Sequence, residues 1–396
     1  MPPDDRMTTA TASVAEDKPA PGLPVLTLVL ATILVIRIFA LVFASTDLHS
    51  DEAQYWLWTQ DLDGVYPSQP PIVIWLISLA SAVCGDSEAC IRSGSPILFT
   101  VSAFLIYALA RRLYDAQIAF WSAIVYATLP AVSAFAMVVT PESALSALWV
   151  AGLLAVSIHL DRPTIPTGLA LGIVIGLGLM ADYSMIYLPL CTALYVILSP
   201  HLRSVLRAFP TWLAIATTAL VLSPQVLAAP DGFLSASLAN ILSDWTFRRL
   251  DPDATLVFIA LQFVLFGPIL FFVLLRTVLL GIVTSSTGSD RFLLYHSVPI
   301  IGALLFEVLF FTAKAHWAMS AFPAAAIFVT ALLLRYRFQR VFFVSMGIHI
   351  TMLAGILGLS VFAVHLDEVP YFDRMIGWRQ FAEELNRAAA LSEVNT

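Results

Sequence analysis

Two adjacent carboxylates, Asp51 and Glu52, begin the stretch "DEAQYWLW" directly after the first long apolar segment of the chain. A carboxylate positioned beside an attacking hydroxyl can take its proton and act as a general base. The aromatic residues of the stretch are of the kind that concentrate at the level of lipid headgroups. Asp51 and Gln54 also have the spacing of a capping box, and an acid in a first helical turn interacts well with the helix dipole. The two acids could therefore do proton-transfer chemistry or only stabilise a helix start.

Further charged candidates lie at two other expected helix starts. Glu142 occurs in "TPES", where Pro141 is suited to the first turn of a helix, so this acid could be a site residue or a dipole partner. Lys314 and His316 occur together in "KAHW", and Lys314 is one of only two lysines. An ammonium group can bind phosphate, although a lysine here could equally extend its charge to water along an apolar surface.

Three other features have open interpretations. Arg248 and Arg249 could bind a phosphate or an acidic sugar, or form a solvated pair. Arg37 lies within the first apolar segment and needs a partner or a water-filled cavity. Cys84 and Cys90 enclose five residues, which allows a disulfide in an oxidising compartment, or they remain two unpaired small residues.

Composition sets the class of protein that must position these residues. Hydrophobic residues make up 59% of the 396 residues and charged residues only 12%, whereas globular domains contain about a quarter charged residues. The apolar runs are too long for barrel strands, so they are expected to be helices that satisfy their own backbone hydrogen bonds. The net charge of −7 without a basic stripe argues against binding to nucleic acid. The chain is predicted to be an all-α polytopic membrane protein.

About eleven transmembrane helices are predicted. They are expected near 25–45, 93–110, 117–139, 143–160, 167–181, 184–199, 208–228, 255–281, 293–312, 318–334 and 342–363. Two segments between the first and second spans are too short or too aromatic to cross. They are predicted to be two interfacial helices on the membrane surface, the second beginning near Pro70 and Pro71.

The distribution of arginine places the N-terminus in the cytoplasm. Residues 1–22 are then a disordered cytoplasmic tail, 23–363 form the transmembrane domain with an outer loop at 46–92, and 364–396 form a short outer segment. In this orientation Asp51 and Glu52 face outward, with Glu142 and Asp182 at or near outer helix ends. The polar chemistry is predicted to lie on the outer face.

A series of motifs in shared order resembles the GT-C class of lipid-dependent glycosyltransferases. The motifs are "DEAQYWLW", "QPPIVIWL", "RSGSPILFTVSAFLIYALARRLY", "TPESALSALW", "GLGLMADYSMIYLPL", "KAHWAMSAFPA" and "GWRQFAEEL". They are most similar to bacterial family-39/83-type enzymes related to protein O-mannosyltransferases and aminoarabinose transferases, and they cover nearly the whole chain. The resemblance implies a GT-C-like helical bundle.

The resemblance also implies an activity at the periplasmic side of the bacterial inner membrane. A sugar would move from a polyprenyl-phosphate carrier to a hydroxyl acceptor such as a lipid-anchored glycan, for example lipopolysaccharide. Asp51 would be the base and Glu52 would orient the acceptor or a divalent cation, with no metal ligand set assigned. Donor phosphate contacts are carried over to Lys314, His316, Arg248, Arg249 and Gln69, and acceptor or positioning roles to Glu142, Tyr55 and Asp182.

Two departures from the family pattern keep a second interpretation open. Many relatives have Lys or His where this chain has Gln69, and many have Lys in a motif "SKY" where this chain has Asp182. Donor preference could differ, or the chain could be a non-catalytic GT-C-like partner in polysaccharide assembly. A transporter would instead show charges at the membrane midplane and inverted repeats. Convergence of Asp51, Glu142 and Lys314 on one outward cavity would favour the transferase.

Overall fold

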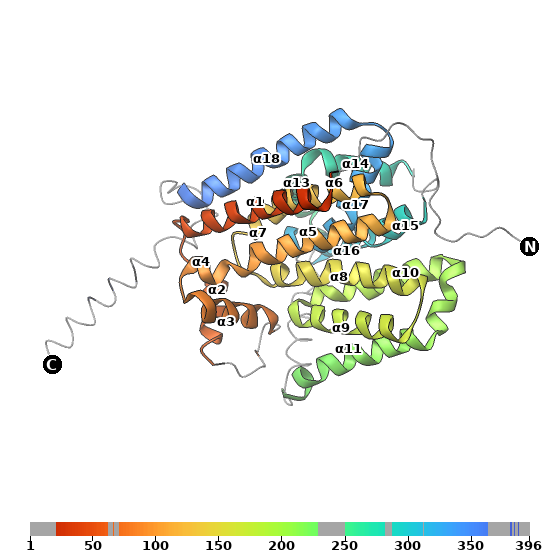
Figure 1. Ribbon diagram of the computed structural model, residues 1–396, viewed down its shortest axis with the longest axis horizontal. Coiled ribbons are helices and arrows are strands. Elements are labelled where there is room, and N and C mark those ends of the chain that lie inside the picture. The colour runs from red at the N-terminus through yellow and green to blue at the C-terminus, as the bar shows by residue number, and fades with distance from the viewer. Residues whose placement is uncertain are drawn as a thin grey trace, which may run out of the picture.

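The computed structural model describes residues 21–61, 66, 71–228, 250–281, 287–311 and 313–362, with residues 381, 384 and 387. The described residues form helices and no strand, so the predicted all-α class is confirmed. Figure 1 shows the longer helices lying along one common direction, with two short helices grouped at one end. Seven helical segments of the described chain are long and apolar enough to cross a membrane, and six shorter apolar helices accompany them. The chain is an integral membrane protein.

The predicted spans coincide with helices of the structure, and their bounds are as follows. The first half contains α1 Leu23–Val42, α2 Ser50–Trp58, α3 Ile72–Cys84, α4 Glu88–Arg92, α5 Gly94–Leu113, α6 Ala116–Thr128, α7 Pro130–Phe135, α8 Pro141–Asp161, α9 Ile165–Ala181 and α10 Tyr187–Leu198, with the short 3₁₀ helix η1 at Tyr183–Ile186. The second half contains η2 Pro200–Arg207, α11 Phe209–Ala228, α13 Pro252–Leu265, α14 Pro268–Leu279, α15 Gly288–Tyr295, α16 Val298–Phe310, η4 Ala315–Ala321, α17 Phe322–Arg335 and α18 Gln339–Phe362. Helices α2 and α3 are the two short helices predicted in the first outer loop.

The prediction of one continuous helix over 255–281 is wrong, because the chain breaks at Gly267 between α13 and α14. Gly267 has φ +92°, a conformation that side chains rarely adopt, and Pro268 begins the next helix. A Cβ atom on Gly267 would lie 2.1 Å from Nε2 of His349 in α18. The close approach of His349 therefore requires glycine at the break. The expected spans 117–139 and 293–312 are likewise each divided into two helices.

Helices α9 and α11 pack closely along a row of glycines. Gly168, Gly172 and Gly176 recur every fourth residue and lie on one face of α9. A Cβ atom on Gly172 would lie 2.4 Å from the carbonyl oxygen of Ala214 in α11. Thr218 of α11 donates a hydrogen bond to the carbonyl of Gly172 over 3.1 Å. Small residues at this spacing allow backbones to approach closely in a membrane, where packing replaces the hydrophobic effect as the source of association.

The substitution Gly172→Ala is expected to lower the thermal stability of the protein. The new methyl group would overlap the backbone of α11, which cannot move as a side chain can, and overpacking of this kind costs about 1–3 kcal/mol. Gly347→Ala in α18 is the control, because a Cβ atom there meets no atom within 4 Å. Replacement of an exposed helical glycine by alanine increases the stability of the helix by up to about 1 kcal/mol. Thermal unfolding in detergent should separate the two variants, and equal midpoints would contradict the packing argument.

The end of the bundle remote from α2 and α3 is tied by ion pairs. Asp290 of α15 accepts hydrogen bonds from Arg335 over 2.7 Å and from the Tyr114 hydroxyl over 2.5 Å. Arg112, in the last turn of α5, pairs with Asp161 at the end of α8. These arginines lie at helix ends that the sequence assigned to the cytoplasm. Arginine ion pairs therefore join helix ends at the end of the bundle remote from α2 and α3.

Candidate active site

The first outer loop positions Asp51 and Glu52 on opposite sides of one helix start. The predicted cap formed by Asp51 and Gln54 is wrong, because His49 is the residue that caps α2. The ring Nδ1 of His49 accepts from the backbone N–H of Asp51 over 3.3 Å, and the Glu52 carboxylate accepts from the backbone N–H of His49 over 2.9 Å. The helix start is satisfied without the Asp51 carboxylate, which leaves that group available for another role.

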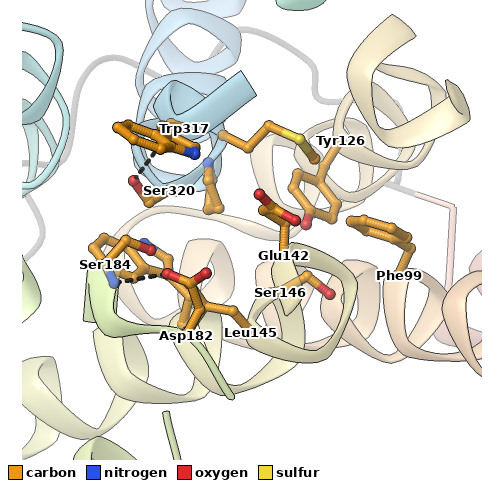
Figure 2. Close-up of a pocket in the computed structure, with 12 residues that line it drawn as sticks. Phe99, Tyr126, Glu142, Leu145, Ser146, Asp182, Ser184, Trp317 and Ser320 are labelled. Atoms are coloured by element: carbon orange, nitrogen blue, oxygen red, sulfur yellow. Dashed lines mark hydrogen bonds between the residues drawn. The ribbon is translucent and has the colours of Figure 1, made fainter. Parts of the chain in front are cut away.

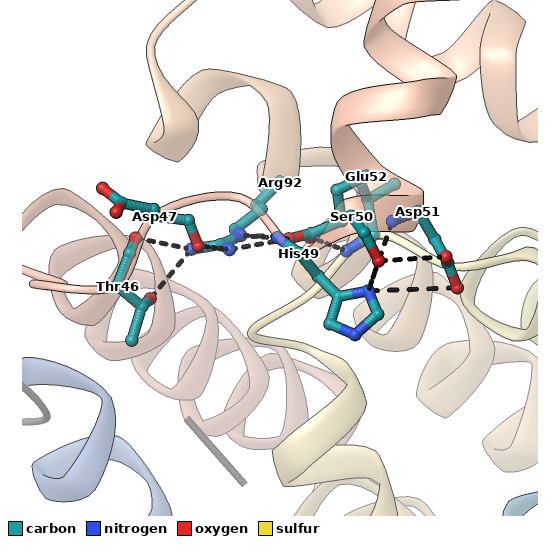
Figure 3. Close-up of polar contacts among 8 residues, drawn as sticks. Thr46, Asp47, His49, Ser50, Asp51, Glu52 and Arg92 are labelled. Atoms are coloured by element: carbon teal, nitrogen blue, oxygen red, sulfur yellow. Dashed lines mark hydrogen bonds and ion pairs between the residues drawn. The ribbon is translucent and has the colours of Figure 1, made fainter. Parts of the chain in front are cut away.

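Glu52 points inward and joins three parts of the chain (Figure 3). Its carboxylate pairs with the buried guanidinium of Arg92 in α4, with the closest nitrogen and oxygen 2.6 Å apart. It also accepts from the backbone N–H of Val139, just before α8, over 2.7 Å. Arg92 in turn donates to the carbonyls of Thr46 and Asp47. Both charges are therefore neutralised and hydrogen-bonded, as a buried pair requires, and Glu52 holds α2 against α4 and the start of α8.

A disulfide and a side-chain hydrogen bond fix the rest of this loop. Cys84 at the end of α3 is bonded to Cys90 in α4, which decides between the two alternatives left by the sequence. Asp86, within the seven-residue disulfide loop, accepts a hydrogen bond from the indole N–H of Trp56 in α2 over 3.0 Å. Helices α2, α3 and α4 are therefore tied to one another by a covalent bond, a hydrogen bond and the Glu52–Arg92 ion pair.

The variant Glu52→Gln is expected to destabilise the protein strongly, because it leaves the Arg92 guanidinium buried without its anion. Breaking a buried pair from one side costs about 3–5 kcal/mol. Asp51→Asn, one residue earlier on the same helix, is the control, since the Asp51 side chain is 63% exposed. Thermal unfolding should also show partial recovery in the double variant Glu52→Gln, Arg92→Gln. Equal stability of the two single variants would contradict the structural role of Glu52.

A pocket opens at the same end of the bundle (Figure 2). It lies between α5, α6, α8, the turn at η1, and the η4–α17 junction. Its lining consists of Phe99, Tyr126, Glu142, Leu145, Ser146, Trp149, Asp182, Ser184, Trp317, Met319, Ser320 and Pro323. Aromatic walls with a few carboxylates and hydroxyls are typical of a site for a polar ligand with an apolar ring.

Glu142 and His316 form a pair at this pocket. Nε2 of His316 lies 3.2 Å from Oε1 of Glu142, which is in the first turn of α8. The ring of His316 also lies against Phe135, with centroids 5.2 Å apart. The carboxylate and the imidazole come from segments more than 170 positions apart, and the fold brings them together. A carboxylate beside an imidazole can hold or exchange a proton at this point.

Asp182 is the second carboxylate of the pocket and lies in the break between α9 and η1. Its side chain accepts from the backbone N–H of Ser184 over 2.7 Å, so it caps η1. Burial first, and then the neighbouring Glu142 carboxylate, raise the pKa of Asp182 to about 6. The hydrogen bond from Ser184 and the nearby His316 oppose the rise.

Tyr55 connects the outer loop to the pocket. It is a buried residue of α2, one turn after Asp51. Burial raises the pKa of the Tyr55 phenol, and the charges of Asp51, Glu142 and Asp182 raise it further. The phenol is therefore neutral at physiological pH and lies within electrostatic range of the loop acid and of both pocket acids. Tyr55 itself packs with Val73, Ile74 and Val139, and no residue of α2 is among those that line the pocket.

Comparisons with known proteins show which proteins this chain resembles. Residues 68–227 match the family model described as dolichyl-phosphate-mannose-protein mannosyltransferase. The chain is 27% identical over 299 residues to the lipid A galacturonosyltransferase RgtD of Rhizobium johnstonii, covering 75% of this chain and 63% of that protein. It is 31% identical over 203 residues to the lipopolysaccharide core galacturonosyltransferase RgtA of the same organism, covering 49% and 39% respectively.

Solved structures show the same fold. ArnT from Cupriavidus metallidurans bound to undecaprenyl phosphate superposes with a TM-score of 0.64 at 16% identity, covering 80% of this chain and 61% of that one. The resemblance to the GT-C glycosyltransferases is confirmed. The Archaeoglobus fulgidus oligosaccharyltransferase gives a TM-score of 0.50 at 14% identity, covering 83% and 52%. The chain spans less than two thirds of the length of these relatives.

The GT-C fold places the other sequence candidates as follows. The Asp51 carboxylate is exposed and lies on the opposite side of the helix start from the Glu52–Arg92 pair (Figure 3). Lys314 is exposed directly before η4, two residues from His316. Gln69, Arg248 and Arg249 lie outside the described residues. Among the described residues no group of three or more His, Cys, Asp or Glu side chains has the geometry of a metal site, and the divalent cation stays a prediction.

Several residues of this GT-C site were missed from sequence. Arg92 was assigned only to the outer side, and His49 and Trp149 were not singled out. Trp149 follows Glu142 by seven residues and Ser146 by three, so helical spacing could have indicated the shared face. No local pattern could have named Arg92, because its partner is 40 residues away. Arg37 was expected to have a partner, and it donates to the carbonyl of Ala127 over 2.6 Å.

The raised pKa of Asp182 predicts a pH-dependent stability. The folded protein binds a proton at Asp182 more tightly than the unfolded chain, so stability decreases as pH rises from the unfolded pKa to about 6, and the loss is complete above that pH. Asp182→Asn can still accept from Ser184 but carries no charge. The thermal unfolding midpoint of Asp182→Asn should therefore exceed that of the unchanged protein at pH 7.5. The difference between the two midpoints should shrink towards pH 5. Glu142, His316 and Tyr55 face Asp182 in both proteins, so a constant difference across this range would contradict the prediction.

Proposed function

We propose that this protein transfers a sugar from a polyprenyl-phosphate carrier to a hydroxyl group of a lipid-anchored glycan at the periplasmic face of the bacterial inner membrane. The observation that carries the proposal is the Glu142–His316 pair beside Asp182 at a pocket of a GT-C bundle, within electrostatic range of Tyr55 in α2, the helix that carries Asp51. A non-catalytic partner of the same fold would not need two carboxylates, Glu142 and Asp182, to line one pocket.

The exposure of Asp51 supports it as the proton acceptor. Its side chain is 63% exposed on α2, while His49 and Glu52 satisfy the helix start. An acceptor hydroxyl that approaches from the surface gives its proton to the Asp51 carboxylate as its oxygen attacks the anomeric carbon. The bond from that carbon to the phosphate oxygen breaks, and polyprenyl phosphate leaves with the electron pair. The Glu52–Arg92 pair holds α2 in place during this step.

The leaving phosphate needs positive charge at headgroup level. Lys314 is exposed at the start of η4, and His316 is two residues further along at the pocket. Charge-assisted hydrogen bonds from these groups would stabilise the phosphate as its charge develops. Similar proteins support a polyprenyl-phosphate donor, because the ArnT structure is of a complex with undecaprenyl phosphate. They support a glycolipid acceptor, because RgtD and RgtA are named for lipid A and the lipopolysaccharide core.

Two observations support the periplasmic side. The Cys84–Cys90 disulfide is in the same loop as Asp51, and disulfides persist in oxidising compartments. The arginine ion pairs Arg112–Asp161 and Arg335–Asp290 lie at the other end of the bundle. An excess of arginine is typical of cytoplasmic loops. The site is accordingly placed on the outer side in this proposal.

The variant Asp51→Asn should lose sugar transfer by about 10²–10⁴-fold, the usual contribution of general-base catalysis. The amide keeps the size of the side chain and cannot take a proton, so thermal stability should stay close to that of the unchanged protein. Transfer is measured with radiolabelled polyprenyl-phosphate sugars and lipopolysaccharide in membranes.

Asp61→Asn is the matched control for Asp51→Asn, because Asp61 is an exposed acid just beyond the end of α2. It should transfer sugar at the rate of the unchanged protein. Normal transfer by Asp51→Asn would remove Asp51 as the base. Absence of transfer by the unchanged protein with every donor would favour the non-catalytic partner instead.

A further inference from the structure

We propose that the pocket between α5, α8, η1 and η4 is the subsite for the donor sugar, and that it selects a sugar without a carboxyl group. This inference rests on the proposed function and adds the class of substrate. It departs from the two curated relatives, which are named for galacturonic acid.

The shape of the pocket follows one face of α8. Glu142, Ser146 and Trp149 succeed one another at helical spacing and all line the pocket. Seven residues of helix correspond to about 10 Å, so the pocket descends by roughly that depth from Glu142 to Trp149. The Glu142–His316 pair stands near its mouth, where the phosphate of a donor would lie beside Lys314. The sugar attached to that phosphate would extend inward.

Trp149 supplies an unused hydrogen-bond donor at the inner end. The residue is 1% exposed, and its indole N–H has no acceptor within the described part of the chain. Buried tryptophan N–H groups almost always find a partner, because an unsatisfied donor is costly. A hydroxyl or ring oxygen of a sugar would provide the acceptor. A polar ligand therefore suits the inner end of the pocket, because an apolar lipid chain would offer the Trp149 N–H no acceptor.

The charges of the pocket decide the class of sugar. Glu142 and Asp182 both line it, and the imidazole of His316 is paired with Glu142. The Asp182 carboxylate accepts hydrogen bonds from the backbone N–H and the side chain of Ser184, neither of which carries a positive charge. A uronic acid would bring a third carboxylate into this enclosed space, where like charges repel strongly. Sugar hydroxyls instead donate hydrogen bonds to Glu142 and Asp182 and bring no further negative charge.

The test uses pairs of donors that differ only at C6. Polyprenyl-phosphate esters of galactose and galacturonate, and of glucose and glucuronate, are titrated into the full-length protein in lipid nanodiscs, with unmodified polyprenyl phosphate as reference. Binding is read from the shift of the unfolding midpoint with donor concentration. In at least one pair the neutral sugar should bind tenfold or more tightly than its uronate and more tightly than the reference lipid.

Two variants assign the selectivity to the pocket. Asp182→Asn should narrow the difference in affinity between the neutral sugar ester and its uronate. The variant removes one repelling charge and keeps an acceptor for Ser184. Trp149→Phe keeps an aromatic ring but removes the N–H. It should therefore weaken the binding of sugar esters about tenfold and leave the affinity for the reference lipid unchanged. Retained affinity for the reference lipid shows that each variant is folded.

Several results would overturn the inference: uronates that bind as tightly as their neutral partners, sugar esters that bind no better than the reference lipid, or a Trp149→Phe variant with unchanged affinity for sugar. Transfer to lipopolysaccharide is measured in parallel. Selective binding without any transfer would refute the proposed function and retain the subsite. Transfer with a preference for a uronate would retain the function and refute the selectivity.

Discussion

The buried ion pair between Glu52 and Arg92 is the interaction on which the arrangement of the outer face depends. It joins α2 to α4, and through the backbone N–H of Val139 it reaches the segment that leads into α8. Without a counter-charge either group would be too costly to bury. With both in place, the helix that carries Asp51 and Tyr55 has one position relative to the helix that carries Glu142. The Glu52–Arg92 pair contributes to the site by fixing the position of α2, with Asp51 and Tyr55, relative to the start of α8, with Glu142.

The carboxylates of this face differ because their surroundings differ. Glu52 is enclosed by donors and remains paired, Asp51 is exposed to the surface, and Asp182 is enclosed beside another acid. Enclosure without a full counter-charge raises the pKa of Asp182, while pairing allows Glu52 to remain buried. The same chemical group thus serves as a structural bridge, a candidate base and a candidate sugar contact. Environment, more than residue type, distinguishes these roles.

Much of the architecture could be predicted from sequence because membrane constraints are strong. Apolar length identified the spans, aromatic and proline residues identified the two short helices of the outer loop, and Asp182 marked a helix break that the structure confirms. The break at Gly267 was missed although the Gly267–Pro268 pair is a local signal for one; the approach of His349, 82 positions away, shows why glycine is needed there. The assignment of Asp51 and Glu52 was equally beyond local reasoning. Adjacent residues on a helix point about 100° apart, and only the position of Arg92 decides which acid turns inward.

The departure from the family pattern at Asp182 acquires a physical meaning in this context. An acid in place of a cation lies against Glu142, so the pocket cannot be neutral unless protons or a ligand compensate. His316 compensates for the charge of Glu142, whereas Asp182 accepts from the neutral backbone N–H and side chain of Ser184. A hydroxylated ring would suit these groups, because its hydroxyls can donate hydrogen bonds to the two acids. One of its oxygens can accept a hydrogen bond from the Trp149 indole N–H. The loop that is fixed by Glu52 and Arg92 holds Asp51 exposed on α2, where a hydroxyl arriving from the membrane surface would meet it.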